Sequence, residues 1–364
     1  MPKPSIMKIT PYVPGRSSPS PGLRTEPGLK TIKLSSNESA LGASPKAIAA
    51  LDGLGGVLAH YPDGSSGNLR AALAQTHGLE ENRIVIGAGS DEILHLLAQI
   101  YIGEGDEAIV SEFGFLVYPI ITRGAGGEPV FVSDKDYRVD VEAILDAVTK
   151  KTRVVFVANP NNPTGTYLSA SEMGRLHRGL RDDILLVIDN AYAEYVSADD
   201  YQTGAELAHT AQNVVMVRTF SKIGLAALRI GWMYGPATII DAVNRLRGPF
   251  NVNYAAQLAG VAAVQDHEFT ARLKAHNSKW RRWLSDQLAS NEIRVLPSQG
   301  NFILAIFTRN GTAGAKKAFQ ALSEKGLVVR EMGAYGLADA LRISIGDEEA
   351  MKRVAVILRD LTQA

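Results

Sequence analysis

The sequence predicts an α/β protein in which a large domain, built on a mostly parallel sheet of seven strands, is followed by a smaller α+β domain. Three observations predict this class. Short apolar runs alternate with longer helical patterns over residues 66–235, the alternation stops after "GPFNVN", and a length of 364 residues suits about two domains. Continuous β-branched runs separated by helices are typical of a parallel sheet that is buried on both faces.

The strands expected in the large domain are "RIVIGAG", "EAIVSE", "EPVFV", "RVVFVANP", "ILLVIDNAY", "NVVMVRTFS" and "LRIGWMYG". Helices are expected at "SDEILHLLAQIY", from Ser90, and near residues 169–180. Ligands of open α/β sheets bind at the carboxyl ends of the strands, so the residues that follow each strand are the candidates for function.

The second half of the chain has a different pattern of helices and strands, and we expect the boundary between the two domains near 246–253. Two helical patterns cover 254–264 and 266–290, the second with Asp266 placed to cap it, and a last helix begins after Gly346. Shorter strands are expected at "NFILAIF", "GLVVR" and "LRISI". We therefore divide the chain into an N-terminal arm, a large cofactor-binding domain and a small C-terminal domain, at residues 1–28, 29–248 and 249–364.

The arm is rich in Pro and Ser, which predicts an extended segment rather than a helix, and one that must dock on the protein to be ordered. Proline stands where a signal peptide needs an apolar core, and no run approaches the roughly 18 apolar residues of a membrane span. We expect a cytoplasmic protein.

The composition excludes several classes of function. Lys plus Arg equals Asp plus Glu at 38 each, so no net charge attracts nucleic acid or a membrane surface. The absence of cysteine excludes disulfides, thiolate metal sites and a cysteine nucleophile. The seven histidines show no pair at metal-ligand spacing, so we expect no metal.

The first candidate site is "GAGSDE", where a helix is expected to begin at Ser90, beside Asp91. Glycines let the backbone approach an anion, and a helix N-terminus offers free N–H groups to a phosphate. The alternative is a dinucleotide-binding fingerprint with Glu112 as its acidic residue, although Glu92 occupies the place of the third glycine.

Aromatic and amide side chains follow the next strands. Phe115 and Tyr118 could stack on a flat ring or belong to the core. The loop "ANPNNPTG" carries three asparagines, which either form a tight turn or bind a ligand.

Asp189 ends a very apolar strand, where a carboxylate needs a cation such as Arg218 or a protonated ring nitrogen. "RTFSKIGLAALRIGW" places Lys222 between hydroxyls and close to Arg229, in an apolar run that we interpret as a strand. Lys222 is either an ordinary strand-end lysine or a covalent anchor beside a bound anion.

One cofactor accounts for all these groups. Pyridoxal phosphate takes a lysine, a phosphate site, an acidic partner for its ring nitrogen and a stacking aromatic side chain. The dinucleotide alternative explains only the first motif.

The chain also resembles the class I/II aminotransferases of fold type I, through "NPNNPTG", "DNAY" and "TFSK…LRIG" in that order. Within them, "LSSNES", "YPDGSSGNLRAAL", "GAGSDE" and "ALRISIG" are similar to the histidinol-phosphate aminotransferases. The resemblance runs from about residue 9 to the C-terminus and implies a homodimer with shared active sites that acts on an amino donor and a 2-oxo acid.

The resemblance also implies a role for each candidate residue. Lys222 would carry the cofactor as an imine and move the proton, Asp189 would keep the ring nitrogen charged, and Tyr192 would bond the ring hydroxyl. The other cofactor contacts would come from Ser90, Asp91, Phe115, Asn162, Thr219, Ser221 and Arg229, and from Tyr61 across the dimer interface. Substrate contacts would come from Arg342, Arg330, Tyr12 and Asn37.

Two departures from the family pattern bear on the substrate and on Arg229. The interval from Lys222 to Arg229 is seven residues where eight is usual, and Ser39 and Ala40 stand where the histidinol-phosphate enzymes usually have Asn-Pro. We expect transfer of the amino group of histidinol phosphate to 2-oxoglutarate. An aromatic amino acid aminotransferase is the alternative, followed by a relative that decarboxylates threonine phosphate.

Overall fold

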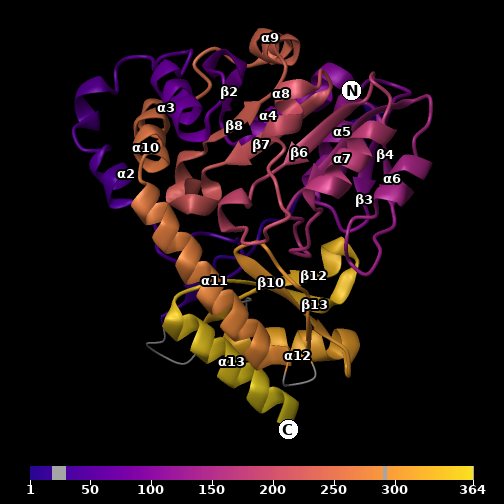
Figure 1. Cartoon of the computed structure of the whole chain (residues 1–364). Helices are drawn as coiled ribbons and strands as arrows, with labels where there is room; N and C mark the ends of the chain where they lie inside the picture. The colour runs from indigo at the N-terminus through magenta and orange to yellow at the C-terminus, as the bar shows by residue number, and fades with distance from the viewer. Residues whose placement is uncertain (19–29, 290–292, 364) are drawn as a thin grey trace.

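The large part of the protein is built on one seven-stranded sheet (Figure 1). The computed structural model describes residues 1–18, 30–289 and 293–363. The strand order is β2-β8-β7-β6-β5-β3-β4, with β8 antiparallel to both of its neighbours and all other pairs parallel. This confirms the predicted sheet. Its strands are β2 (Ile84–Gly87), β3 (Glu107–Ser111), β4 (Glu128–Val132), β5 (Thr152–Ala158), β6 (Leu185–Asp189), β7 (Val214–Thr219) and β8 (Gly231–Tyr234).

Alternating side chains of the central strands enter two separate apolar cores. On β5, Val155 and Val157 belong to one core, and Val154 and Phe156 belong to the other. Helices α4 (Ser90–Tyr101), α5 (Val117–Ala125) and α9 (Ala237–Leu246) contribute to the core of one face. The other face is covered by α3 (Gly67–His77), α6 (Val141–Asp146), α7 (Ala170–Gly179), α8 (Ala205–Thr210) and α10 (Tyr254–Val264).

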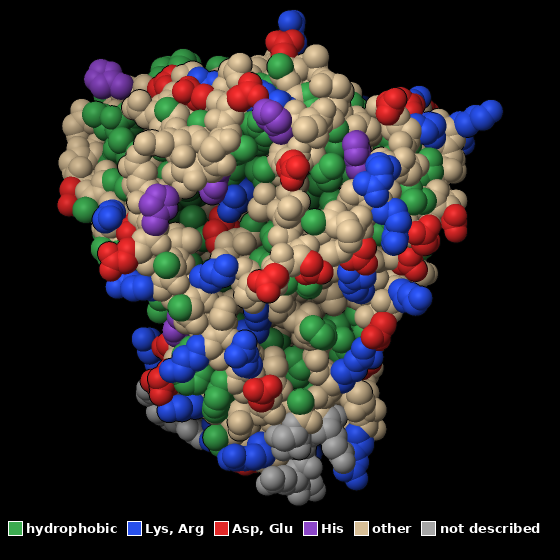
Figure 2. All heavy atoms as spheres, viewed as in Figure 1, with side chains coloured by type: hydrophobic (Ala, Val, Ile, Leu, Met, Phe, Trp, Pro, Cys, Tyr) green, Lys and Arg blue, Asp and Glu red, His purple; other side chains and the backbone are tan. Residues whose placement is uncertain are grey.

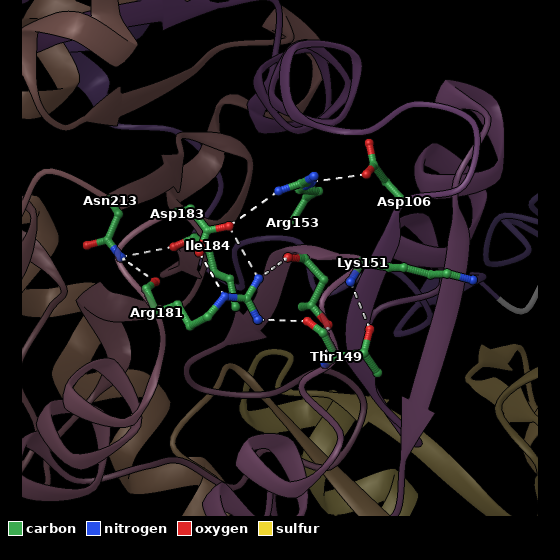
Figure 3. A network of polar contacts seen from close by, with 9 residues as sticks. Asp106, Thr149, Lys151, Arg153, Arg181, Asp183, Ile184 and Asn213 are labelled. Carbon is green, nitrogen blue, oxygen red and sulfur yellow. Dashed lines mark hydrogen bonds and ion pairs between the residues drawn. The ribbon is translucent and has the colours of Figure 1, made fainter.

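A polar network ties together the amino ends of the central strands (Figure 3). Arg153 binds Asp106 at 3.0 Å and Asp183 at 3.3 Å, and Arg181 donates to the carbonyl oxygen of Thr149 at 2.7 Å. The network lies at the edge of the sheet opposite the carboxyl ends. It therefore lies away from the carboxyl ends of the strands, where a ligand is expected to bind.

The small part contains a four-stranded antiparallel sheet in the order β12-β13-β10-β9. The predicted strands "NFILAIF" and "LRISI" and the predicted last helix are present as β10, β13 and α13, whereas "GLVVR" is divided between β11, outside this sheet, and the first residue of β12. The sequence does not indicate β1, β9 or α12. A separate short pair joins β1 to β11 in parallel. The elements are β1 (Ile32–Lys33), β9 (Ile293–Val295), β10 (Phe302–Phe307), β11 (Leu327–Val328), β12 (Arg330–Met332), β13 (Leu337–Ser344), α11 (His267–Ala289), α12 (Gly311–Glu324) and α13 (Glu348–Gln363).

Helix α11 connects the two parts. Figure 1 shows it running from beside α10 in the large part to α13 in the small part. Phe269 and Leu273 belong to the core of the large sheet, whereas Trp280 and Leu284 belong to the core of the small sheet. The predicted division at residue 248 remains a prediction, and these contacts favour a division within α11.

The prediction of an extended arm is wrong at its start, where α1 (Pro4–Met7) forms a single helical turn. Proline is tolerated in the first turn of a helix, where its missing N–H has no helical partner. Further along, the arm docks on the body of the protein: Arg330 donates to the carbonyl oxygen of Val13, and Ser35 donates to that of Arg16. Residues 19–28 of the predicted arm lie outside the described residues.

Charged side chains of both signs are interspersed over the face shown in Figure 2. Within the described ranges, no helix combines the length and the apolar character needed to cross a bilayer.

Candidate active site

A cavity of about 360 Å³ lies at the carboxyl ends of the central strands. Ala158, Asp189 and Thr219, which end β5, β6 and β7, line it together with arm and small-domain residues. Apart from Tyr61, every residue predicted for the site lines this cavity: Tyr12, Asn37, Ser90, Asp91, Phe115, Asn162, Asp189, Tyr192, Thr219, Ser221, Lys222, Arg229, Arg330 and Arg342.

One end of the cavity is built to receive an anion. Helix α4 begins there at Ser90, and its N-cap residue is Gly89, which has no side chain to cap the first N–H groups of the helix. Arg229 lies alongside, 3.3 Å from the hydroxyl of Ser221 and 3.2 Å from the carboxylate of Asp91. A Cβ added at Gly231 would come within 2.3 Å of the backbone nitrogen of Ser90, so only glycine leaves this approach open. A helix N-terminus with a nearby guanidinium is a suitable phosphate site.

The segment that carries Lys222 is not a sheet strand, contrary to our interpretation of its apolar run. It forms two short helical turns, η4 (Ser221–Leu225) and η5 (Ala226–Leu228), and β8 begins only at Gly231. Gly224 has a φ of 102°, and a Cβ there would lie 2.3 Å from the carbonyl oxygen of Gly42. Gly224 therefore packs closely on the loop that contains Gly42, and its positive φ is incompatible with an extended strand at this point.

The amine of Lys222 faces the cavity, 3.5 Å from the carbonyl oxygen of Ser36. Burial, together with the positive charges of Arg342 and Arg229, lowers the pKa of Lys222 to about 8, against the opposing effect of Asp91 and Glu38. A lysine with a pKa near 8 has a substantial fraction of free amine at neutral pH, which is the form that attacks a carbonyl.

We expect the chain freed of cofactor to capture pyridoxal phosphate covalently with a pH midpoint of about 8. The protonated amine cannot attack, so the rate should rise as the pH passes through this pKa and then level off. An unperturbed lysine would show a rate that still rises toward a pH of about 10. Stopped-flow absorbance between pH 6 and 10 measures this, and a continued rise above pH 9 would contradict the lowered pKa.

Asp189 is buried at the end of β6 without a cationic partner in the described chain. Arg218, which we had considered as its partner, binds Glu194 at 2.6 Å instead. The hydroxyl of Tyr118 donates to Asp189 at 2.9 Å, and burial raises the pKa of Asp189 to about 6. The site therefore presents a buried carboxylate that a protonated ring nitrogen would stabilise.

Two amides connect the cofactor side of the cavity to the small domain. Asn37 donates to the hydroxyl of Tyr192 at 3.0 Å. The side-chain oxygen of Asn162 accepts from Arg342 at 2.5 Å, which leaves its NH₂ group as the donor for a ligand. Arg342 also donates to the carbonyl oxygen of Ser35, and its Nε is buried without a partner in the described ranges. Arg342 thus brings a buried positive charge to the wall of the cavity.

The arm and the small domain form the outer side of the cavity. The guanidinium of Arg330 lies 5.4 Å from the ring centre of Tyr12, and the Tyr12 ring meets Phe115 edge-on at 6.3 Å. Phe115 lines the cavity from the large domain.

Tyr61 does not join the other predicted residues. It is 81% exposed and stacks on Phe250, with ring centres 4.6 Å apart. Its role therefore remains a prediction that depends on a second copy of the chain.

The donors around the cavity fit pyridoxal phosphate: the anion site at Ser90 and Arg229, the buried carboxylate of Asp189, and the amine of Lys222 all face one space. The fold and the site define a pyridoxal-phosphate-dependent enzyme of fold type I. Residues 30–358 match the family described as aminotransferase class I and II, and the chain belongs to this family. It is a pyridoxal-phosphate-dependent aminotransferase, as predicted.

The chain is similar to curated relatives over almost its whole length. It is 52% identical over 363 residues to histidinol-phosphate aminotransferase of Nitrobacter hamburgensis, covering 99% of this chain and 98% of the relative. It is 51% identical over 357 residues to the Rhodospirillum rubrum protein of the same name, covering 98% of this chain and 95% of that one. The structure of histidinol-phosphate aminotransferase from Sinorhizobium meliloti in complex with pyridoxal-5'-phosphate is similar with a TM-score of 0.86 and 28% identity, over 92% of each chain.

Three kinds of contact in the site could not be predicted from the sequence. Tyr118 was considered only as a stacking or core residue, although its hydroxyl binds Asp189. Pro14, Gly15 and Glu38 line the cavity but carry no motif of their own. Asn37 accepts from the hydroxyl of Ser344, at the end of β13, and donates to Tyr192 of the "DNAY" motif, and these two contacts could have been found only from the fold.

Proposed function

We propose that this aminotransferase moves the amino group of histidinol phosphate to 2-oxoglutarate, in histidine biosynthesis. About 50% identity with histidinol-phosphate aminotransferases over the full length supports this substrate. The structural observation that carries the proposal is the pair of buried arginines, Arg330 and Arg342, which line the cavity together. This role agrees with the cytoplasmic location expected from the sequence.

The two arginines suit the alternating substrates of such a reaction. One half-reaction brings a phosphate, which is nearly dianionic at neutral pH, and the other brings a dicarboxylic 2-oxo acid. A guanidinium can meet either anion with two charge-assisted hydrogen bonds. Arg342 is held by Asn162 and Ser35, so it offers a fixed charge, and Arg330 supplies a second charge at the arm.

The bound cofactor supplies an electron sink for the negative charge left on the donor carbon when it loses its proton. Lys222 would hold the cofactor and then take and return that proton at its Nζ. Asp189 would keep the ring nitrogen protonated, while Asn162 and Tyr192 would bind the ring oxygen. Ser90 and Arg229, with Asp91, Thr219 and Ser221, would hold the phosphate end.

Replacing Arg330 by Ala should affect histidinol phosphate more than phenylalanine. Losing a buried charge-assisted contact costs on the order of 2–5 kcal/mol, which corresponds to a fall of about 30-fold or more in kcat/KM. Phenylalanine would use Arg342 for its carboxylate and should lose less. The two kcat/KM values in wild type and variant are the measurement, with 2-oxoglutarate as acceptor. Equal losses, or a wild type that prefers phenylalanine, would favour the aromatic alternative.

We also propose a homodimer in which Tyr61 reaches the partner's active site, since it is exposed and outside the cavity of its own chain. Subunits with Tyr61→Phe and subunits with Lys222→Ala should each be severely impaired as homodimers. Verified heterodimers should regain activity, because one site then contains both native residues. Heterodimers as inactive as the parent homodimers would count against shared sites.

A further inference from the structure

Tyr195 binds the main chain of the lysine that faces the cavity. It is 1% exposed, and its hydroxyl donates to the carbonyl oxygen of Lys222 at 2.5 Å. The chain leaves helical geometry directly after Lys222, at Ile223 and Gly224. The Lys222 carbonyl oxygen is thus bound by a side chain from another element at the point where η4 becomes irregular.

Tyr195 belongs to the same turn as Tyr192. The single turn η3 (Ala193–Tyr195) follows β6, and the N–H of Tyr195 donates to the carbonyl oxygen of Tyr192 at 3.0 Å. Residues three apart lie one above the other in a 3₁₀ turn. The Tyr192 hydroxyl meets Asn37 at the cavity, and the Tyr195 hydroxyl meets the main chain of Lys222. One short turn after Asp189 therefore fixes both the ring-binding side chain and the lysine.

A second contact also restrains the Lys222 segment, since Gly224 packs closely on Gly42. The segment is therefore held at two points, by this backbone contact and by the Tyr195 hydroxyl. The Lys222 Nζ lies 5.8 Å from the centre of the Tyr192 ring. A shift of the Lys222 main chain would move Nζ relative to Asp189 and Tyr192, which belong to the neighbouring strand end.

We propose that Tyr195 is a positioning residue, which holds the Lys222 main chain so that the amine reaches both the cofactor and the donor carbon. This inference rests on the proposed role of Lys222. Tyr195 does not line the cavity, and its hydroxyl faces the Asn301 side chain as well as the Lys222 carbonyl oxygen. It would therefore act on the reaction through the lysine and not by touching the substrate.

The test compares Tyr195→Phe with Tyr201→Phe in the full chain. Tyr201 is a matched control because its hydroxyl also donates to a backbone carbonyl, that of Asn159, at 3.0 Å, and neither of these two residues lines the cavity. Displacement of a reacting group by about 1 Å costs on the order of 100-fold in rate. We expect Tyr195→Phe to lower kcat by about 10- to 100-fold and to change KM for the donor by less than about threefold. Tyr201→Phe should change neither constant comparably.

A second readout separates positioning from a loss of stability. A Lys222 segment released toward water should regain part of its ordinary basicity, so the pH midpoint of covalent cofactor capture should rise above about 8 in Tyr195→Phe. It should stay in place in Tyr201→Phe. A Tyr195→Phe variant with a lower Tm but the control's kcat and midpoint would overturn the proposal.

Two further measurements cover the cases in which Tyr195→Phe does not fold or in which Lys222 is not the cofactor lysine. If Tyr195→Phe does not fold, Tyr195→Met also removes the hydroxyl, and it must show the same fall in kcat and rise in midpoint or the proposal fails. Borohydride reduction and peptide mapping of wild type identify the cofactor lysine independently. An adduct on another lysine would reject the role of Lys222, whereas an adduct on Lys222 with a silent Tyr195→Phe would reject the positioning role alone.

Discussion

Replacing Lys222 by Ala should lower kcat for transamination by at least about a thousandfold, because the variant loses both the covalent attachment and the proton carrier. The amine lies in the cavity with a pKa lowered to about 8, so in wild type it can accept and release a proton at neutral pH. Pyridoxal phosphate should still bind through the groups around Ser90 and Arg229. Steady-state rates with histidinol phosphate, together with the cofactor content of the dialysed variant, measure both effects.

Lys352→Ala is a suitable control, since Lys352 is an exposed lysine on α13 that pairs with Glu348 at 2.6 Å. It should retain wild-type kcat and cofactor content. Added methylamine should restore part of the activity of Lys222→Ala by acting as a free base, but should not affect the control. Substantial turnover by Lys222→Ala without any added amine would exclude Lys222 as the proton carrier.

Much of the site could be predicted because its residues follow strands that the sequence identifies. Asp189 and Thr219 end continuous apolar runs, and parallel strands bring their carboxyl ends to one edge of a sheet. The helix that begins at Ser90 was recognisable from its glycines and its helical pattern. Local pattern therefore located the cofactor side of the cavity and the order of its elements.

The remaining contacts depend on how distant segments pack. The apolar run after Lys222 was interpreted as a strand because its composition suits one, but the contact of Gly224 with Gly42 imposes a turn there. The hydrogen bond from Tyr118 to Asp189 joins residues 71 positions apart, and no periodicity indicates it. The packing of α10 on the large sheet also depends on tertiary contacts. The sequence does not indicate it, because α10 comes after the change in sequence pattern that predicts the domain boundary.

The buried carboxylate of Asp189 leads to the last prediction: Asp189→Asn should keep the cofactor but lower kcat by about 100- to 1,000-fold, the usual effect of removing one preorganised electrostatic group. A neutral amide cannot hold the ring nitrogen protonated, so the charge that develops on the donor carbon is poorly stabilised. KM should change little, because the effect arises in the transition state. Tyr118 can still donate to the amide oxygen, so the fold should be retained.

Asp134→Asn provides the matched control for this experiment. Asp134 is also a largely buried carboxylate just beyond a sheet strand, burial raises its pKa to about 6 as well, and Ser111 donates to it at 2.5 Å. It does not line the cavity, so its amide variant should share any general effect of removing a buried charge while keeping nearly wild-type kcat. The measurement is kcat and KM for both variants beside their Tm and cofactor content. If the two variants lose kcat to the same extent, the loss reflects the removal of a buried charge, and Asp189 has no special role at the ring nitrogen.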